Sequence, residues 1–545
     1  MRNDRYMGYI GLMLSLLWPG LLAAQSLRPA PASSWAHRDP RTDSVAGISL
    51  QQAYALLQGR PSVPVIVGVL DSGVDLNHED LRDMLWTNAA EQPDNKLDDD
   101  RNGYADDRHG WNFMGAPDGT TYEYDQPELT QTYLLLRPTY EGVDRATLTP
   151  TQQRQFDTYQ QAKKLYLPRY RAAQSQLLAF SDTVRFWQTA ARLAASLPDS
   201  ATTQAAIRRV SLGPDSVAQA VQQVLATGYL PRYGSFAAYT RLVRLNFTRF
   251  IEVVGGEGLI AYNPAYNARQ SVGDNPANLS ERYYGNPAVR PQPGSELGIH
   301  GTHVAGIIAA RRGNGRGIDG IADQARIMAV SVVPAHGDER DKDIANGIRY
   351  AVDNGAKVIN MSFGKRLSPF KEQVDFAIRY AALHDVVIVH AAGNNGEDLD
   401  TTPNFPSAID EQGRRAPNVL TVGNSTPYLD NRLVAASSNY GLQLVDLFAP
   451  GTDINSTLPM NQYAPFSGTS MAAPHVAGVA ALLRSYFPTL TAVEVCTIIR
   501  QSAYRPTLVV TRPGRSGDLI PFQNLSQTGG LLNAADAVRL ALSRP

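Results

Sequence analysis

Short apolar runs alternate with amphipathic segments through most of the second half of the chain. The runs are rich in Val, Ile and Leu, and we expect them to form strands at 327–333, 358–361, 386–389 and 419–422. Segments with apolar residues at helical spacing, roughly 343–354 and 368–383, separate these runs. Strands without an exposed face are typical of parallel sheets that helices cover on both sides. The pattern therefore predicts an α/β fold with right-handed crossovers.

An earlier apolar run, 63–70, predicts another buried strand that delivers Asp71 at its carboxyl end. Ligand sites of open parallel sheets lie at such ends, so Asp71 is a candidate functional residue, with a turn cap as the alternative. A helix of small residues begins near His300, and an apolar helix over 471–486 follows Ser470. The start of a helix offers free N–H groups and a positive dipole. Ser470 is therefore a candidate nucleophile, with a simple helix cap as the alternative.

The composition shifts between residues 115 and 291, where Gln, Ala, Tyr and Arg are abundant. Helix signals occur in this part without a catalytic or metal-binding pattern, so we expect a mostly helical insertion. The predicted organisation is a signal peptide (1–24), an N-terminal extension (25–60), a discontinuous α/β domain (61–114 and 292–545) and the insertion (115–291).

The first residues have the pattern of a cleavable signal peptide. Arg2 and Arg5 precede an apolar run over 7–17 that is too short to span a bilayer, and small residues follow up to Ala24. We therefore expect export to the periplasm, the cell surface or the medium, with no transmembrane segment in the mature chain. The formal net charge of −1 gives no global attraction to nucleic acid, so we expect no nucleic-acid partner.

An acidic stretch resembles the front of a calcium-binding loop. Oxygen-bearing side chains stand at its first, third, fifth and ninth positions, with glycine at the sixth for a sharp turn. The predicted metal ligands are Asp98, Asp100, Asn102, Tyr104 and Asp106. A solvated acidic loop is the alternative, and His109 at the twelfth position excludes a full EF-hand. The only cysteine, Cys496, cannot form an intramolecular disulfide, which favours structural calcium as a source of rigidity. No organic cofactor is expected.

Four motifs occur in an order that resembles the subtilase (subtilisin-like, S8) family of serine peptidases. They are Asp71-Ser72-Gly73, His300-Gly301-Thr302-His303, Ala392-Gly393-Asn394 and Gly468-Thr469-Ser470-Met471-Ala472-Ala473-Pro474. The resemblance covers about 61–114 and 295–540, and it implies a subtilisin-like fold. It also implies that Asp71 orients His300, that His300 is the general base for Ser470, and that the Asn394 amide stabilises an oxyanion.

The same resemblance implies a substrate pocket and a further metal site. The walls of the pocket would be Ser362, Phe363, Gly364, Ala391, Ala392 and Gly393, with Asn404 near its floor. Asp80 and Asn314 fall where many family members bind calcium. Asp341 and Asp343 either border the next subsites or pair with Arg340 and Lys342 on a solvated face.

The insertion separates Asp71 from His300 by several times the spacing usual in the family. Its two ends should therefore emerge on the active-site side of the sheet, and we hypothesise that it forms a lid or wall. The predicted function is a secreted serine endopeptidase acting on proteins or peptides. The alternatives are a subtilase-type acyl transferase or macrocyclase, which differs in how well water is excluded, and an inactive secreted binding scaffold.

Overall fold

The computed structural model describes residues 35–195, 260–291 and 295–544. The predicted signal peptide, 1–24, lies outside these residues. The chain divides into two compact units, one of residues 1–30 and 163–266 and the other of residues 31–162 and 267–545. The boundaries of these units therefore fall inside the predicted insertion, because 115–162 and 267–291 belong to the larger unit.

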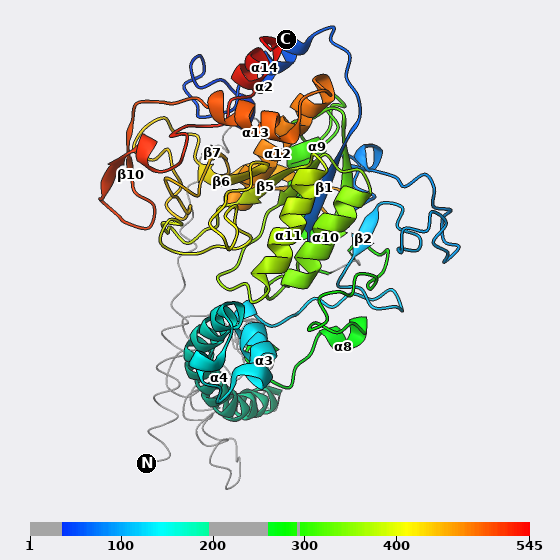
Figure 1. Cartoon of the computed structure of the whole chain (residues 1–545), viewed down its shortest axis with the longest axis vertical. Helices are drawn as coiled ribbons and strands as arrows, with labels where there is room; N and C mark the ends of the chain where they lie inside the picture. The colour runs from blue at the N-terminus through cyan, green and yellow to red at the C-terminus, as the bar shows by residue number, and fades with distance from the viewer. Residues whose placement is uncertain (1–34, 196–259, 292–294, 545) are drawn as a thin grey trace. The chain divides into compact units, whose positions relative to one another are not determined.

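A parallel sheet of seven strands forms the centre of the larger unit (Figure 1). The strands, in spatial order, are β2 (Gly110–Asn112), β3 (Ala325–Ser331), β1 (Val65–Asp71), β4 (Val358–Met361), β5 (Val387–Ala391), β6 (Val419–Ser425) and β7 (Leu447–Pro450). All neighbouring pairs are parallel. The predicted α/β class with a parallel sheet is therefore confirmed.

Helices cover both faces of this sheet, each over its own apolar cluster. One face packs against α2 (Leu50–Leu57), α9 (Ile299–Ala309), α12 (Thr469–Tyr486), α13 (Ala492–Gln501) and α14 (Ala534–Leu542). The other face packs against α10 (Asp341–Asp353) and α11 (Lys371–Leu383). β1 shows why both faces are apolar, since Val67 and Val69 face the first cluster and Leu70 faces the second.

Part of the predicted N-terminal extension belongs to the apolar core. Trp35, Ile48, Leu50 and Leu57 are buried in the same cluster as α9 and α12. α2 lies against α14 near the C-terminus, so the two ends of the described chain meet at one side of the sheet (Figure 1).

Two short hairpins also belong to the larger unit. β8 (Ile454–Leu458) pairs with β9 (Gln462–Phe466), and β10 (Val509–Thr511) pairs with β11 (Leu519–Pro521), both antiparallel. β9 leads directly into the turn before α12. Single 3-10 turns occur at Trp35–His37, Arg82–Met84, Arg145–Thr147 and Phe522–Asn524.

The insertion contributes α3 (Glu128–Tyr140), α4 (Pro150–Ala195) and the short α8 (Arg269–Val272). The first part of α4 belongs to the larger unit and its remainder to the smaller one. In the smaller unit, the Tyr166 hydroxyl donates a hydrogen bond of 3.0 Å to the Tyr262 carbonyl. None of the helices in the described part of the chain combines the length and apolar character needed to cross a membrane.

Candidate active site

The parallel register brings the predicted site residues to one edge of the sheet. Asp71 is the last residue of β1, Ser362 follows β4 and Ala391 ends β5. Leu70 pairs with Met361, and Met361 pairs with His390, so these three strand ends are aligned. Residues that are far apart in the sequence therefore meet at the carboxyl edge, where parallel sheets bind ligands.

Asp71 and His300 form a close pair. His300 Nδ1 lies 2.9 Å from Asp71 Oδ1 and 3.0 Å from Oδ2, and the Asp71 side chain is buried. A carboxylate accepts hydrogen bonds, so Nδ1 carries the proton and Nε2 is bare. The Ser72 backbone N–H donates to Asp71 Oδ1 at 2.8 Å and fixes the carboxylate. His300 is thus oriented with a basic nitrogen directed away from Asp71.

The approach of α9 to the end of β1 requires glycine at position 301. A Cβ atom there would lie 2.1 Å from the Gly73 carbonyl oxygen and 3.2 Å from the Asp71 side chain. Only a residue without a side chain lets the first turn of α9 approach β1 this closely. This contact holds His300 beside Asp71.

The two histidines of α9 differ in their electrostatics. Burial opposes a charged imidazole at His300, but the charge and hydrogen bond of Asp71 outweigh it and raise the pKa above 6.5. Burial lowers the pKa of His303 to about 3, and its ring stacks on Phe466 at 4.5 Å. His303 is therefore a neutral packing residue, whereas the pKa of His300 lies above its ordinary value because of Asp71.

Ser470 lies in the first turn of α12 and is tied to Ser362. The Ser470 hydroxyl donates to the Ser362 carbonyl oxygen at 2.9 Å, and the Ser362 hydroxyl donates to the Ser470 carbonyl oxygen at 2.9 Å. In the described residues this hydroxyl therefore bonds to Ser362 rather than to His300. α9 and α12 pack against each other in the same apolar cluster.

Asn394 follows β5 and reaches the start of α12. Its Oδ1 accepts hydrogen bonds from the Thr469 backbone N–H at 2.8 Å and the Thr469 hydroxyl at 3.1 Å. The Gly393 N–H in turn donates to the Thr469 hydroxyl at 3.0 Å. Because Oδ1 is engaged, the Nδ2 end of the exposed Asn394 side chain is the donor that faces away from Thr469. Thr469 was not predicted as a site residue, although it adjoins Ser470 in the motif.

The predicted pocket residues lie on two neighbouring strand ends joined by Asn404. Asn404 Nδ2 donates to the Ala392 carbonyl at 3.1 Å, and a Cβ at Gly364 would lie 2.9 Å from the Asn404 amide. Two residues that the sequence did not indicate support these walls. Asn439 Nδ2 donates to the Ala392 carbonyl at 2.9 Å, and His390 Nε2 lies 2.8 Å from the Phe363 carbonyl oxygen. No motif marks either residue.

A profile of the Subtilase family matches residues 64–532. The chain belongs to the subtilase family. A thermophilic serine proteinase of Bacillus sp. strain AK1 is 47% identical over 190 residues, which cover 35% of this chain and 43% of that protein. Thermitase of Thermoactinomyces vulgaris is 45% identical over 186 residues, which cover 34% of this chain and 61% of that protein. The chain thus spans about half the length of these relatives.

A solved structure described as proteases from Pseudoalteromonas arctica is also similar to the chain. It is 31% identical, with a TM-score of 0.36, and the match covers 44% of this chain and 70% of that one.

The start of α10 differs from both sequence-based interpretations. The four charged residues here do not pair with one another on a solvated face, and their carboxylates are not free. Each of them, Arg340, Asp341, Lys342 and Asp343, has an ion-pair partner elsewhere in this subtilase. These ion pairs are Arg340–Asp125, Lys365–Asp341, Lys342–Asp274, Lys342–Glu281 and Arg269–Asp343. Asp341, Lys342 and Asp343 are buried, and three of their four partners, Arg269, Asp274 and Glu281, come from the predicted insertion. Loss of either partner of such a buried pair would leave an uncompensated charge inside the protein, which is strongly destabilising.

The acidic loop brings together a group of carboxylates that shares only Asp100 with the predicted metal ligands. Carboxylate oxygens of Glu91, Asp100 and Asp107 lie within 4.8 Å of one another. Asp98 instead accepts from the N–H groups of Asn102 and Gly103, and Asp106 accepts from those of Asn95 and Lys96. The Tyr104 ring packs edge-on against Trp111 and Tyr350. Glu91 and Asp107 were not among the predicted ligands, because the EF-hand spacing does not select their positions.

Asp80 and Asn314, which the resemblance placed at a calcium site of the family, contact each other directly. Asn314 Nδ2 donates to Asp80 Oδ1 at 2.6 Å. The other carboxylate oxygen accepts from the Ile318 N–H at 3.2 Å and the Tyr463 hydroxyl at 2.9 Å. Both Asp80 oxygens therefore have protein donors.

Proposed function

We propose that this subtilase is an exported serine endopeptidase in which Asp71, His300 and Ser470 act together. The observation that supports this most strongly is the Asp71–His300 pair, which leaves a bare imidazole nitrogen at the edge of the sheet that also carries Ser470. His300 would take the Ser470 proton as the hydroxyl turns from the Ser362 carbonyl and attacks a peptide carbonyl. Attack forms an acyl-enzyme and releases the amine, which receives the proton from His300. Water then hydrolyses the acyl-enzyme.

The developing oxyanion needs donors at the start of α12. Asn394 Nδ2 and the Ser470 backbone N–H would supply them, because Thr469 holds the other end of the Asn394 amide. One such donor contributes on the order of 100 to 1000-fold in rate. Because the raised pKa of His300 must be exceeded before its imidazole is neutral, we expect kcat/KM to rise with pH through that pKa.

The proposed substrates are proteins or peptides that place a side chain between the two strand ends. Ser362, Phe363 and Gly364 would line one wall, and Ala391, Ala392 and Gly393 the other, with Asn404 at the base. This lining is apolar with a polar floor and has no free charge. Asp341 and Asp343 are paired inside the protein, so we do not expect them to select basic substrate residues.

We also propose that Glu91, Asp100 and Asp107 hold a structural calcium ion. Their donors are the hard oxygen ligands that calcium prefers, and they come from positions close together in the folded loop. Burial raises the pKa of Asp107 to about 6 in spite of hydrogen bonds from Tyr350 and Asn88, and a bound cation would favour its ionised form. Calcium would fix the loop without taking part in the reaction.

Hydrolysis of a casein substrate and of short peptides tests the proposed activity. We expect Ser470→Ala to abolish cleavage, whereas Ser467→Ala, three residues earlier, should retain it because the Ser467 hydroxyl bonds to the Asp453 region. Parent protein that folds but cleaves neither substrate would contradict the proposal and favour an inactive scaffold. Mass analysis of the peptide products separates hydrolysis from acyl transfer, since a macrocyclase yields products that lack the added water.

A further inference from the structure

Lys365 is a fully buried cation with three oxygen partners. Its Nζ lies 2.7 Å from Asp341 Oδ1 and 3.1 Å from Glu128 Oε2, and it donates to the Glu339 carbonyl oxygen at 2.8 Å. The exposed fraction of the Lys365 side chain is 0%. A buried ammonium remains charged only where nearby negative groups compensate for the lost water. These contacts are therefore strong constraints on the position of Lys365.

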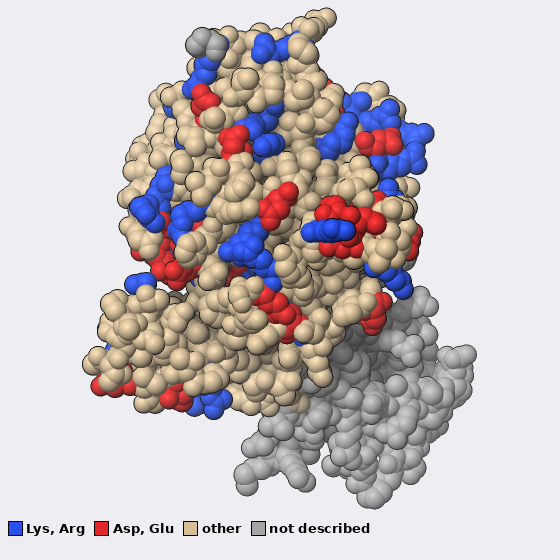
Figure 2. Space-filling model, turned by 45° about the vertical axis from the view of Figure 1, so that its right-hand side comes forward, with Lys and Arg blue, Asp and Glu red and all other residues tan. Residues whose placement is uncertain are grey.

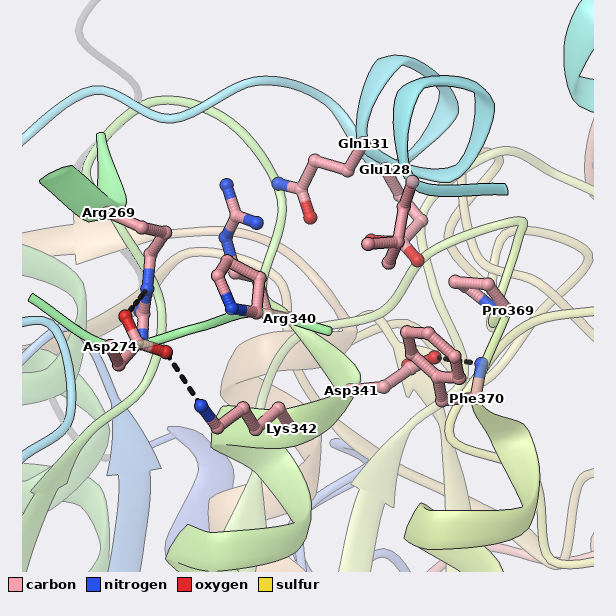
Figure 3. A pocket seen from close by; sticks show the side chains of 11 residues that line it. Glu128, Gln131, Arg269, Asp274, Arg340, Asp341, Lys342, Pro369 and Phe370 are labelled. Atoms are coloured by element: carbon pink, nitrogen blue, oxygen red, sulfur yellow. Dashed lines mark hydrogen bonds and ion pairs between the residues drawn. The ribbon is translucent and has the colours of Figure 1, made fainter. Parts of the chain in front are cut away.

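The partners of Lys365 connect three separate parts of the larger unit. Glu128 is the first residue of α3 in the predicted insertion, and Asp341 is the first residue of α10. Asp341 also accepts from the Ser368 hydroxyl at 2.9 Å and the Phe370 N–H at 2.8 Å. Figure 3 shows Glu128 on α3, and it shows Asp341 beside Phe370, in the turn that precedes α11. Lys365 thus joins the insertion to α10 and to the turn before α11.

Lys365 also directly follows, in the chain, the Ser362–Gly364 segment that contacts Ser470. Ser362, three residues earlier, exchanges two hydrogen bonds with Ser470. The Lys365 backbone pairs in both directions with Phe405, next to Asn404 at the proposed pocket floor. A shift of Lys365 would therefore move one wall and the floor of the proposed pocket together.

We propose that Lys365 is a positioning residue through which Glu128 of the insertion holds the Ser362–Gly364 segment in its substrate-binding conformation. The inference rests on the proposed function of that segment as a pocket wall. It assigns the first turn of α3 a role in substrate binding, although α3 lies in the segment that separates Asp71 from His300 in the sequence.

The charge balance of this cluster decides which variants are informative. The carboxyl groups of Glu128 and Asp341 contact one ammonium, and the charge of that ammonium also acts on the buried carboxyl group of Glu339. Burial raises the pKa of Glu128 to about 8 and that of Glu339 to about 8, despite the opposing effect of Lys365. A neutral amide at position 128 should therefore be tolerated. Glu128→Gln is the conservative variant, whereas Glu128→Leu and Lys365→Met remove the polar contact.

The test compares substrates of different length. KM and kcat are measured for single-residue esters and for peptides extended on the N-terminal side of the cleaved bond, together with the rate of labelling by a fluorophosphonate. For Lys365→Met and Glu128→Leu we expect KM for the extended peptides to rise on the order of 10 to 100-fold, the scale of a small misplacement. Ester cleavage and labelling should stay close to the parent rates, and Glu128→Gln should restore KM.

Lys371→Met provides a matched control. Lys371 also contacts one aspartate, Asp375, and one backbone carbonyl, that of Ile409, but it lies in α11 and should leave KM unchanged. Circular dichroism confirms folding of each variant. The inference is wrong if folded Lys365→Met and Glu128→Leu keep the parent KM for extended peptides, or if labelling falls as much as peptide cleavage. Loss of labelling and cleavage in the parent would instead contradict the proposed function.

Discussion

The two sides of the proposed site are held by different forces. On the side of α9 and α12, the contacts are close apolar packing, with Ala472, Ala473 and Val476 fully buried. On the side of α10, four successive charged residues are held by ion pairs, mostly with the insertion. On the face drawn in Figure 2, Lys and Arg side chains lie among those of Asp and Glu. The close packing forms among the helices and strands of the sheet itself, whereas the ion pairs need partners from a distant segment.

This difference suggests how an insertion can become part of an enzyme. Ion pairs are specific in geometry, and a buried charge without its partner is strongly destabilising. Arg269 and Asp274 therefore fix the end of the insertion against α10, much as Glu128 fixes its beginning. Asp274 lies between Arg269 and Lys342, as Figure 3 shows.

Removing the Arg269 cation should cause the largest loss of stability. Arg269 bonds to Asp274 at 2.7 Å and to Asp343 at 2.8 Å, and the three side chains are buried. Arg269→Met leaves the buried Asp343 carboxylate without its cation and Asp274 with Lys342 alone, so we expect the free energy of unfolding to fall by about 3–5 kcal/mol in denaturant titrations. Arg145→Met removes an exposed pair with Asp157 and should have little effect. Equal effects would contradict the importance of the buried pairs.

Removing the Asn394 amide, on the side of α9 and α12, should reduce kcat rather than the free energy of unfolding. For Asn394→Ala we expect kcat to fall on the order of 100 to 1000-fold, because the oxyanion loses one donor. KM should change much less, since the donor acts mainly in the transition state. Asn395→Ala, at the neighbouring exposed position, is the control. A rate close to that of the parent would exclude Asn394 from the oxyanion site.

Adding one methyl group between α9 and β1 should have a moderate effect. At Gly301 the new Cβ meets the Gly73 carbonyl at 2.1 Å, whereas at Gly68 the nearest atom is the Ala351 Cβ at 3.1 Å. We expect Gly301→Ala to lower the free energy of unfolding by about 1–3 kcal/mol, the cost typical of overpacking, in spite of its better helix propensity. Gly68→Ala should cost less. The reverse order would mean that α9 can shift freely.

The smallest expected effect is a change in the pH dependence of the free energy of unfolding, caused by Glu128 on the side of α10. Because burial raises the pKa of Glu128 from 4.5 to about 8, the folded state favours its protonated form. This contribution to stability is complete below pH 4.5 and is lost as pH rises through about 8. Glu128→Gln should therefore flatten the decline between these values, as measured by unfolding at several pH values. A steeper decline in the variant would contradict the assignment.

The sheet and its strand ends could be predicted from the sequence, because a run of neighbouring apolar residues is enough to indicate a buried strand. The runs at 358–361 and 419–422 coincide with β4 and the first part of β6. Asp71 and His300 were also indicated, since a short motif marks each of them, and the structure brings them together. Their roles in catalysis remain predictions.

The ion pairs and the acidic loop could not be predicted in the same way. Asp343 and Arg269 are far apart in the sequence, and nothing in the composition of either segment selects the other as its partner. Glu91 meets Asp100 and Asp107 only after the chain turns back, so a linear spacing rule retained Asp98 and Asp106 instead. Such partners depend on the path of the folded chain.

Peptide mapping of a fluorophosphonate-labelled protein shows whether an oriented histidine activates Ser470. We expect mass spectrometry to find the probe on Ser470 in the parent protein. Labelling should be slower by several orders of magnitude in His300→Ala and absent in Ser470→Ala. Probe attached to another residue, or labelling of His300→Ala at the parent rate, would contradict the account.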